Sequence, residues 1–130
     1  MQVEDGRWKM AGNKIRSFED LEVWNVAQDL AVKVYEITKT FPRDEMFALT
    51  NQLRRSAYSI SANIAEGFGR QTKRDKLHFY TIAYGSLLEV KNFLYLSNKL
   101  GYIDIPALKD VIDHTTSCQK LVNAFKAGLN

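Results

Sequence analysis

Apolar residues recur every three or four positions through most of this chain, and that spacing constrains the fold more than any other feature. Four segments show it, at about residues 17–39, 43–66, 72–100 and 104–129. No segment alternates apolar and polar residues as a half-buried strand would. Only two prolines occur among 130 residues, so long helices can form. We therefore predict an all-α protein.

Residues suited to helix ends bound these segments. Hydroxyl and carboxylate oxygens at a helix start accept hydrogen bonds from free backbone N–H groups. A glycine just after a helix readily takes a left-handed backbone conformation. By these criteria we predict helix starts at Ser17, Thr72 and Asp104 and a helix end at Gly101. Because the connections are short, successive helices should be antiparallel neighbours, which predicts an up-down-up-down four-helix bundle.

The bundle domain should occupy residues 17–130 and follow a flexible N-terminal arm, residues 1–16, which shows no clear period. A single cysteine, Cys118, excludes an internal disulfide framework and fits a reducing compartment. The apolar runs are too short to span a bilayer, and no secretory signal follows the N-terminus. We expect a cytoplasmic protein without a membrane partner.

Gly67-Phe68-Gly69 is a candidate phosphate-binding loop, but its context is wrong for one. A dinucleotide fingerprint needs a third glycine and lies between a strand and a helix, whereas these glycines follow a predicted helix. We interpret them as a stop signal. Gly67 or Gly69 would take a positive φ, and Arg70 would bond the last carbonyls of the helix.

The titratable residues suggest neither a metal centre nor a catalytic site. His78 and His114 each follow an aspartate at short spacing, but those pairs open two different helices, so an antiparallel bundle places them at opposite ends. Cys118 falls on an apolar helical face and is predicted to be buried. We therefore expect no catalytic residue, no metal ligand and no cofactor, and the protein should not be an enzyme.

A polar stripe runs along the second predicted helix at heptad spacing, with a partial counterpart on the third. Its side chains are small or amide-bearing, whereas a solvated face usually carries long lysines and glutamates. Two interpretations stay open: an ordinary solvated face, or a tightly packed contact between helices or subunits in which Glu66 or Glu89 pairs with an arginine. The residues of this packing or assembly motif are Gln52, Ser56, Ser59, Asn63, Glu66, Gly67, Gly85, Ser86 and Glu89.

The basic residues allow contact with nucleic acid without requiring it. The formal net charge is +3 and the isoelectric point is near 9.0, and the cations form no single stripe interleaved with exposed aromatics. We therefore favour non-specific phosphate contact near the turn between the second and third helices over sequence-specific recognition. The candidate nucleic-acid-binding residues are Arg54, Arg55, Arg70, Lys73 and Arg74.

Three segments also resemble a known family: SFEDLEVWNVAQDLAVKVYEITKTFP, LTNQLRRSAYSISANIAEGFGR and HFYTIAYGSLLEVKNFLYLSNKLGYI. Together they cover about residues 17–103 and resemble the bacterial four-helix-bundle proteins encoded in intervening sequences of 23S ribosomal RNA genes. The resemblance implies a bundle that assembles as a homopentamer and brings no catalytic residues. The fold is also similar to the accessory proteins of diversity-generating retroelements, which bind nucleic acid and a reverse transcriptase.

From the residues and the resemblance together we expect a non-catalytic, homo-oligomeric protein, a pentameric ring, that binds RNA or DNA through basic residues. The alternative is a protein-binding adaptor or scaffold for a partner such as a reverse transcriptase, without direct contact to nucleic acid.

Overall fold

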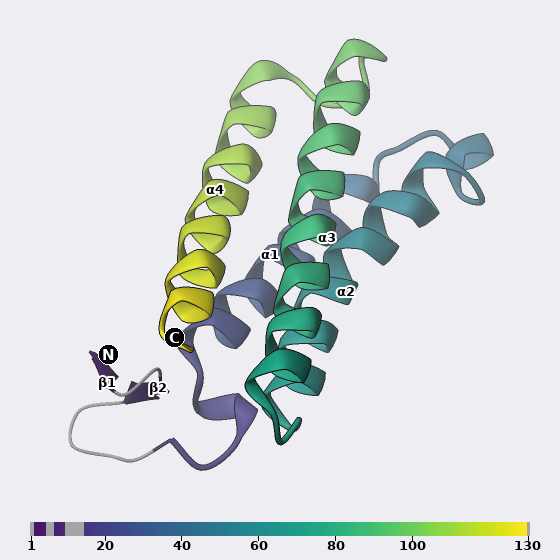
Figure 1. Ribbon diagram of the computed structural model, residues 1–130. Coiled ribbons are helices and arrows are strands. Elements are labelled where there is room, and N and C mark those ends of the chain that lie inside the picture. Colours follow the sequence, from purple (N-terminus) through teal and green to yellow (C-terminus); the bar gives the residue numbers. More distant parts are fainter. Residues whose placement is uncertain (1, 5–6, 10–14, 130) are drawn as a thin grey trace.

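Four long helices dominate the structure (Figure 1), a computed structural model that describes residues 2–4, 7–9 and 15–129. They are α1 (Glu22–Thr38), α2 (Leu49–Phe68), α3 (Lys73–Lys99) and α4 (Ile105–Ala127). Two short 3₁₀ helices, η1 (Phe18–Asp20) and η2 (Arg43–Glu45), precede α1 and α2. The predicted all-α four-helix fold is confirmed.

Contacts between α1 and α2 show that these two helices run antiparallel. Gln28, early in α1, donates to Ser61 Oγ late in α2 at 2.8 Å, whereas Arg54 Nε, early in α2, donates to Thr38 Oγ1 at the end of α1 at 2.8 Å. Each further helix packs on its predecessor, and α1 also contacts α4, so the four helices enclose one core. In Figure 1, α3 and α4 stand side by side, and α1 and α2 lie behind them at an incline.

The core consists of apolar side chains drawn from all four helices. Tyr80 of α3 lies against Phe125 of α4, with ring centroids 4.9 Å apart. Removing such side chains from water stabilises the bundle by roughly 25 cal/mol per Å² of apolar surface. Among the helices the structure describes, none combines the length and apolarity needed to cross a bilayer. Other fully buried members of the core are Leu21, Leu30, Leu53, Ile60, Leu87 and Leu94.

Local capping chemistry determines several helix ends as predicted. The Asp75 N–H donates to Thr72 Oγ1 at 3.1 Å, which starts α3, and Gly101 follows that helix with φ 83°. The Ala107 N–H donates to Asp104 Oδ1 at 2.9 Å, which starts α4. At the first predicted helix start, Ser17 caps the short η1 instead, and α1 begins only at Glu22.

The predicted start of the second helix is wrong. Residues 43–45 form the separate η2, and α2 begins at Leu49 after Ala48 breaks the path with φ −126° and ψ −107°. A tertiary contact stabilises this turn, because the Tyr102 hydroxyl donates to Glu45 Oε2 at 2.7 Å. Met46, which lies within the predicted second helix, belongs to this turn instead and is 44% exposed.

The N-terminal segment contains a short hairpin that the sequence did not predict. Strand β1 (Gln2–Glu4) pairs antiparallel with β2 (Arg7–Lys9), and Val3 lies opposite Trp8. Strands of three residues are too short to show a recognisable alternation. Ile15, just after this segment, belongs to the core.

Candidate functional site

The middle of the polar stripe forms the contact between α2 and α3. Ser59 Oγ donates to Ser86 Oγ at 2.6 Å, joining the two helices, and lies 3.0 Å from the carbonyl oxygen of Ser56. Asn63 Nδ2 donates to the Ser59 carbonyl at 2.7 Å. Ser56 and Ser86 are each 5% exposed. These small side chains let the two helices approach closely, so this part of the stripe is a packed polar contact within the chain.

The C-terminal end of the stripe holds an ion pair and a crowded glycine. Arg70 Nη2 lies 3.2 Å from Glu66 Oε1, a pairing that one of the two open interpretations of the stripe included, and the guanidinium covers the Phe79 ring at 4.6 Å from its centroid. A Cβ at Gly67 would lie 2.7 Å from Tyr80 Cε1 and 2.9 Å from Phe79 Cβ. Gly67 therefore permits the close packing of α3 against α2.

The predicted way in which α2 ends, with a glycine at positive φ and Arg70 bonded to the last carbonyls, is wrong. Gly67 is inside the helix, and Gly69, the residue after it, has φ −78° rather than a positive φ. Arg70 is engaged with Glu66, and Lys76 of α3 bonds the last carbonyls instead: its Nζ donates to the Phe68 oxygen at 2.6 Å. Burial among these groups lowers the pKa of Lys76 below its usual range.

The N-terminal part of the stripe borders a small polar hollow of about 150 Å³. Gln52, Arg55, Ser56, Ser59 and Glu89 line it. Arg55 and Glu89 are both exposed, and the described residues form no ion pair with either. Gly85 has nothing within 4 Å of an added Cβ, so no contact within the chain requires a glycine there.

The structure divides the five candidate nucleic-acid-binding residues into two groups. Arg54 is committed to the fold, because its Nε bonds Thr38 Oγ1 and its guanidinium lies 4.8 Å from the centroid of the Tyr35 ring. Arg70 is occupied by the contacts described above. Three candidates are exposed and have no ion pair with any described residue: Arg55, Lys73 and Arg74.

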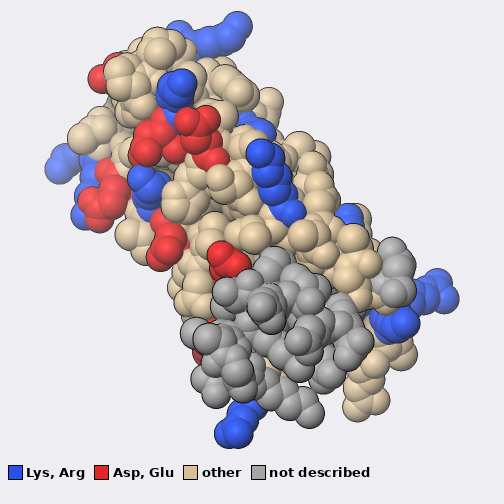
Figure 2. All heavy atoms as spheres, turned by 90° about the vertical axis from the view of Figure 1, so that its left-hand side faces the viewer, with Lys and Arg blue, Asp and Glu red and all other residues tan. Residues whose placement is uncertain are grey.

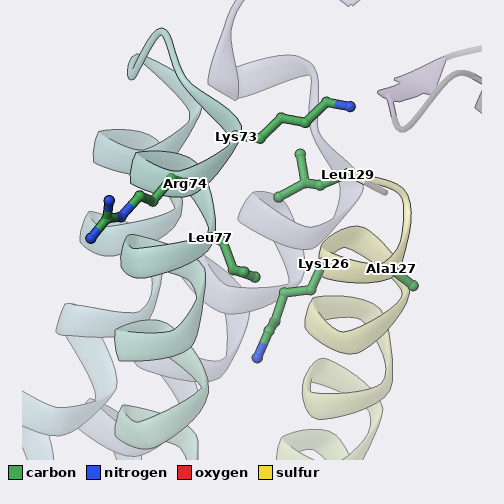
Figure 3. Close-up of a pocket in the computed structure, with 6 residues that line it drawn as sticks. All are labelled: Lys73, Arg74, Leu77, Lys126, Ala127 and Leu129. Carbon is green, nitrogen blue, oxygen red and sulfur yellow. The ribbon is translucent and has the colours of Figure 1, made fainter.

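A second hollow of about 420 Å³ lies where the start of α3 meets the end of α4. Figure 3 shows Leu77 and Leu129 facing the space between the helices, with the Lys73 nitrogen directed outward and Arg74 directed to the other side of α3. Lys126 extends from α4 towards α3, where its Nζ lies 5.5 Å from the centroid of the Tyr84 ring. Lys126 was not among the candidate residues predicted from the sequence. The antiparallel order of the last two helices could have placed it beside Lys73.

Charges of both signs mingle on the face that Figure 2 presents, which is the left-hand side of Figure 1. Lysine and arginine side chains there are interspersed with aspartate and glutamate, and no continuous basic stripe crosses this face. The basic residues on this face are scattered, as their positions in the sequence indicated. A phosphate contact on this face would therefore depend on a few separate cations.

The single cysteine of the chain is enclosed in the core. Cys118 is 0% exposed, and burial raises the pKa of its thiol to about 12, so the thiol stays protonated at neutral pH. This confirms the prediction that Cys118 is a buried apolar residue. Within residues 15–129, no three His, Cys, Asp or Glu side chains gather closely enough to hold a metal ion.

Comparison with known proteins gives a family and a fold. The family model described as 23S rRNA-intervening sequence protein matches residues 19–124. The chain is similar to a crystal structure from Bacteroides thetaiotaomicron, described as a protein with unknown function from the S23 ribosomal protein family, with 25% identity and a TM-score of 0.74. That match covers 80% of this chain and 97% of the other. No curated protein matches the sequence.

Proposed function

The chain belongs to the family of 23S rRNA-intervening sequence proteins, and we propose that it is a non-catalytic cytoplasmic scaffold that forms a homopentameric ring and binds RNA or DNA. The observation that carries the proposal is the pair Arg55 and Arg74, which are exposed and free of ion pairs with described residues. An arginine that is not already paired can bond a phosphate with two parallel hydrogen bonds.

Assembly would make these two separate, weak contacts effective. One subunit carries a net charge of only +3, but a ring repeats its cations at fixed spacing. Repetition strengthens the local field and lets several weak phosphate contacts act together. Lys73, next to Arg74 at the start of α3, would add to the positive potential there, whereas Arg70 is paired with Glu66.

One exposed flank of α3 supports self-assembly. Leu77, Leu88 and Tyr95 are 43%, 50% and 49% exposed, and they recur along the helix at spacings of eleven and seven residues, which places them on one face. Large apolar side chains gathered on one exposed face favour contact with another protein surface. In a homo-oligomer that surface is a second copy.

A salt series with charge-matched variants tests nucleic-acid binding. The site variant Arg55→Gln/Arg74→Gln removes two cations, and the control Lys99→Gln/Lys120→Gln removes two exposed cations elsewhere. We expect filter binding of a single-stranded RNA to weaken about tenfold or more in the site variant and less in the control. The slope of log affinity against log salt should fall by about 1.4, or 0.7 per lost phosphate contact.

Two results would contradict this proposal. One is the absence of wild-type affinity for RNA and for DNA at low salt. The other is an equal loss of affinity in the site and control variants, which would show that only net charge matters.

A protein-binding adaptor is the second candidate, and the exposed apolar face of α3 favours it. An adaptor without nucleic-acid contact would bind a purified reverse transcriptase equally well before and after Arg55→Gln/Arg74→Gln. Leu88→Lys would abolish that binding, because it places a charge in the apolar contact. Retention of the enzyme by Leu88→Lys would exclude this face as the docking surface.

A further inference from the structure

The turn before α2 carries the most exposed large apolar side chain described. Phe47 is 95% exposed and its neighbour Met46 is 44% exposed. In Figure 1 this turn extends outward from the bundle at the right of the view. Asp44, also exposed, stands three residues before Phe47. The turn therefore presents an aromatic side chain with a carboxylate close by.

A complementary hollow lies at the other end of the bundle. It is the hollow of about 420 Å³ between the start of α3 and the end of α4. Leu77, Ala127 and Leu129 give it an apolar wall, Lys73 and Lys126 stand at its rim, and none of its lining residues is acidic. In Figure 3 the Lys73 nitrogen points away from the leucines, whereas Lys126 reaches towards α3 and its Nζ lies 5.5 Å from the centroid of the Tyr84 ring. Lys73 is therefore the rim cation that is free to meet a carboxylate.

We propose that Phe47 of one copy inserts into this hollow on the next copy, with Asp44 facing Lys73. The match has two independent parts. An exposed aromatic ring meets a vacant apolar wall, which removes both surfaces from water. A carboxylate beside the ring meets a cationic rim, which orients the approach and disfavours the reverse pairing. The inference rests on the proposed self-assembly and names the contact that would produce it.

A single copy cannot make this contact with itself. The turn precedes α2, and the hollow lies beyond its other end, at the start of α3. The 20 residues of α2 span about 30 Å. The contact therefore joins two different surfaces of neighbouring copies, and such a head-to-tail contact closes into a ring when its rotation permits. The contact occupies Lys73, whereas Arg55 and Arg74 stay available to bind phosphate.

Sedimentation of the full chain tests the contribution of the aromatic ring. Phe47→Ser should reduce the oligomer to monomers at protein concentrations where the wild type is assembled. The matched control is Val32→Ser, which removes a 60% exposed apolar side chain from α1 and should leave the mass unchanged. Circular dichroism should show the same helical content in all three proteins, because neither side chain belongs to the core.

A charge exchange tests the orientation. Asp44→Lys alone and Lys73→Asp alone should each raise the dissociation constant of the oligomer about tenfold or more, because each places like charges together. The double variant should recover most of the loss. If both single variants weaken the oligomer and the double variant does not restore its affinity, the pairing of Asp44 with Lys73 is wrong.

A disulfide test measures proximity and ring size together. Under mild oxidation, Phe47→Cys/Leu129→Cys should give a ladder of covalent oligomers that stops at the ring size. An equal mixture of the two single variants should stop at cross-linked dimers. The native Cys118 is buried and should not take part.

The outcomes separate this contact from assembly itself. If the wild type is oligomeric, but Phe47→Ser keeps the same mass and the cysteine pair does not cross-link, this contact is wrong and another surface assembles the protein. If the wild type is monomeric at every concentration tested, the proposed ring and this contact both fail.

Discussion

Gly67 and Tyr80 set how closely α2 and α3 can pack, because a Cβ at position 67 would lie only 2.7 Å from Tyr80 Cε1. The same Cβ would lie 2.9 Å from Phe79 Cβ, an atom fixed to the α3 backbone. Relief would therefore require the helices to separate rather than one ring to turn. Ser59 and Ser86, hydrogen-bonded at 2.6 Å further along the same contact, depend on that spacing.

Gly67→Ala should therefore destabilise the protein. Overpacking a tight contact costs about 1–3 kcal/mol, while replacing glycine by alanine within a helix gains about 1 kcal/mol. We expect a net loss of about 1 kcal/mol in the free energy of unfolding, measured by urea denaturation.

Gly85→Ala is the matched control, because an added Cβ there has nothing within 4 Å. It should stabilise the protein by about 0.5–1 kcal/mol, through helix propensity alone. Equal stability of the two variants would show that the crowding at Gly67 has no energetic effect.

The features that were predicted correctly from the sequence depend on residues that are close together along the chain. The caps at Thr72 and Asp104 and the left-handed Gly101 follow from local hydrogen bonding and backbone sterics, and all three were predicted correctly. Helical periodicity likewise gave the helices and the burial of Cys118. These features need no knowledge of what a segment packs against.

The predictions failed where a contact with a residue distant in the sequence determines the local structure. The turn at residues 43–48 depends partly on Tyr102, which bonds Glu45 from the connection between α3 and α4, and no local pattern reveals that partner. Gly67 was interpreted as a helix stop because its contact with Tyr80 is tertiary. Arg54 was grouped with surface cations because its distance to Tyr35 depends on how α1 and α2 pack.

Arg54 and Arg55 are adjacent in sequence but should respond oppositely to substitution. Arg54→Gln loses a hydrogen bond to buried Thr38 and a cation–π contact with Tyr35, which together are worth about 1–2 kcal/mol. We expect that loss in the free energy of unfolding, with little change in RNA affinity after correction for the folded fraction.

Arg55→Gln is the matched variant, since Arg55 is exposed and has no ion pair with the described residues. It should weaken RNA binding and leave the free energy of unfolding within about 0.5 kcal/mol of the wild type. The reverse assignment, with Arg54 governing RNA affinity, would contradict the division drawn from the structure.

Cys118 should react with thiol reagents only when the protein unfolds. Its side chain is fully buried and its pKa is raised to about 12, so the native protein offers almost no thiolate at pH 8. Labelling should be at least about a thousandfold slower in buffer than in denaturant, as expected for a group exposed only by unfolding. Rapid labelling under native conditions would contradict the burial of this thiol.

The same burial predicts a loss of stability at high pH. Because the folded pKa lies above the ordinary value of 9.0, the folded state retains the thiol proton when the unfolded state has lost it. The contribution is complete below pH 9 and falls as pH rises toward about 12. Cys118→Ala should show a shallower decline than the wild type over this window, measured by the denaturant midpoint.

Asp110 provides a test at the acidic end of the pH range. A hydrogen bond from Lys33, at 2.7 Å, and the charge of that lysine lower the pKa of this carboxyl below its ordinary value of 3.8, and His114 lowers it further. A carboxylate with a lowered folded pKa contributes stability above the unfolded pKa and loses it as pH falls through the folded pKa. The bridge should therefore persist at pH 3.8, the ordinary value for this group, and be lost only at a lower pH.

An NMR titration of the Asp110 carboxyl carbon should follow this directly. The wild type should titrate below 3.8, and Lys33→Gln should return the midpoint toward that value, because the largest cause of the shift has been removed. Lys39→Gln is the control, since Lys39 pairs with Glu36 at 3.2 Å and not with Asp110. Identical midpoints in the wild type and Lys33→Gln would show that the Lys33 ammonium does not interact with this carboxyl in solution, and that the link between α1 and α4 does not depend on it.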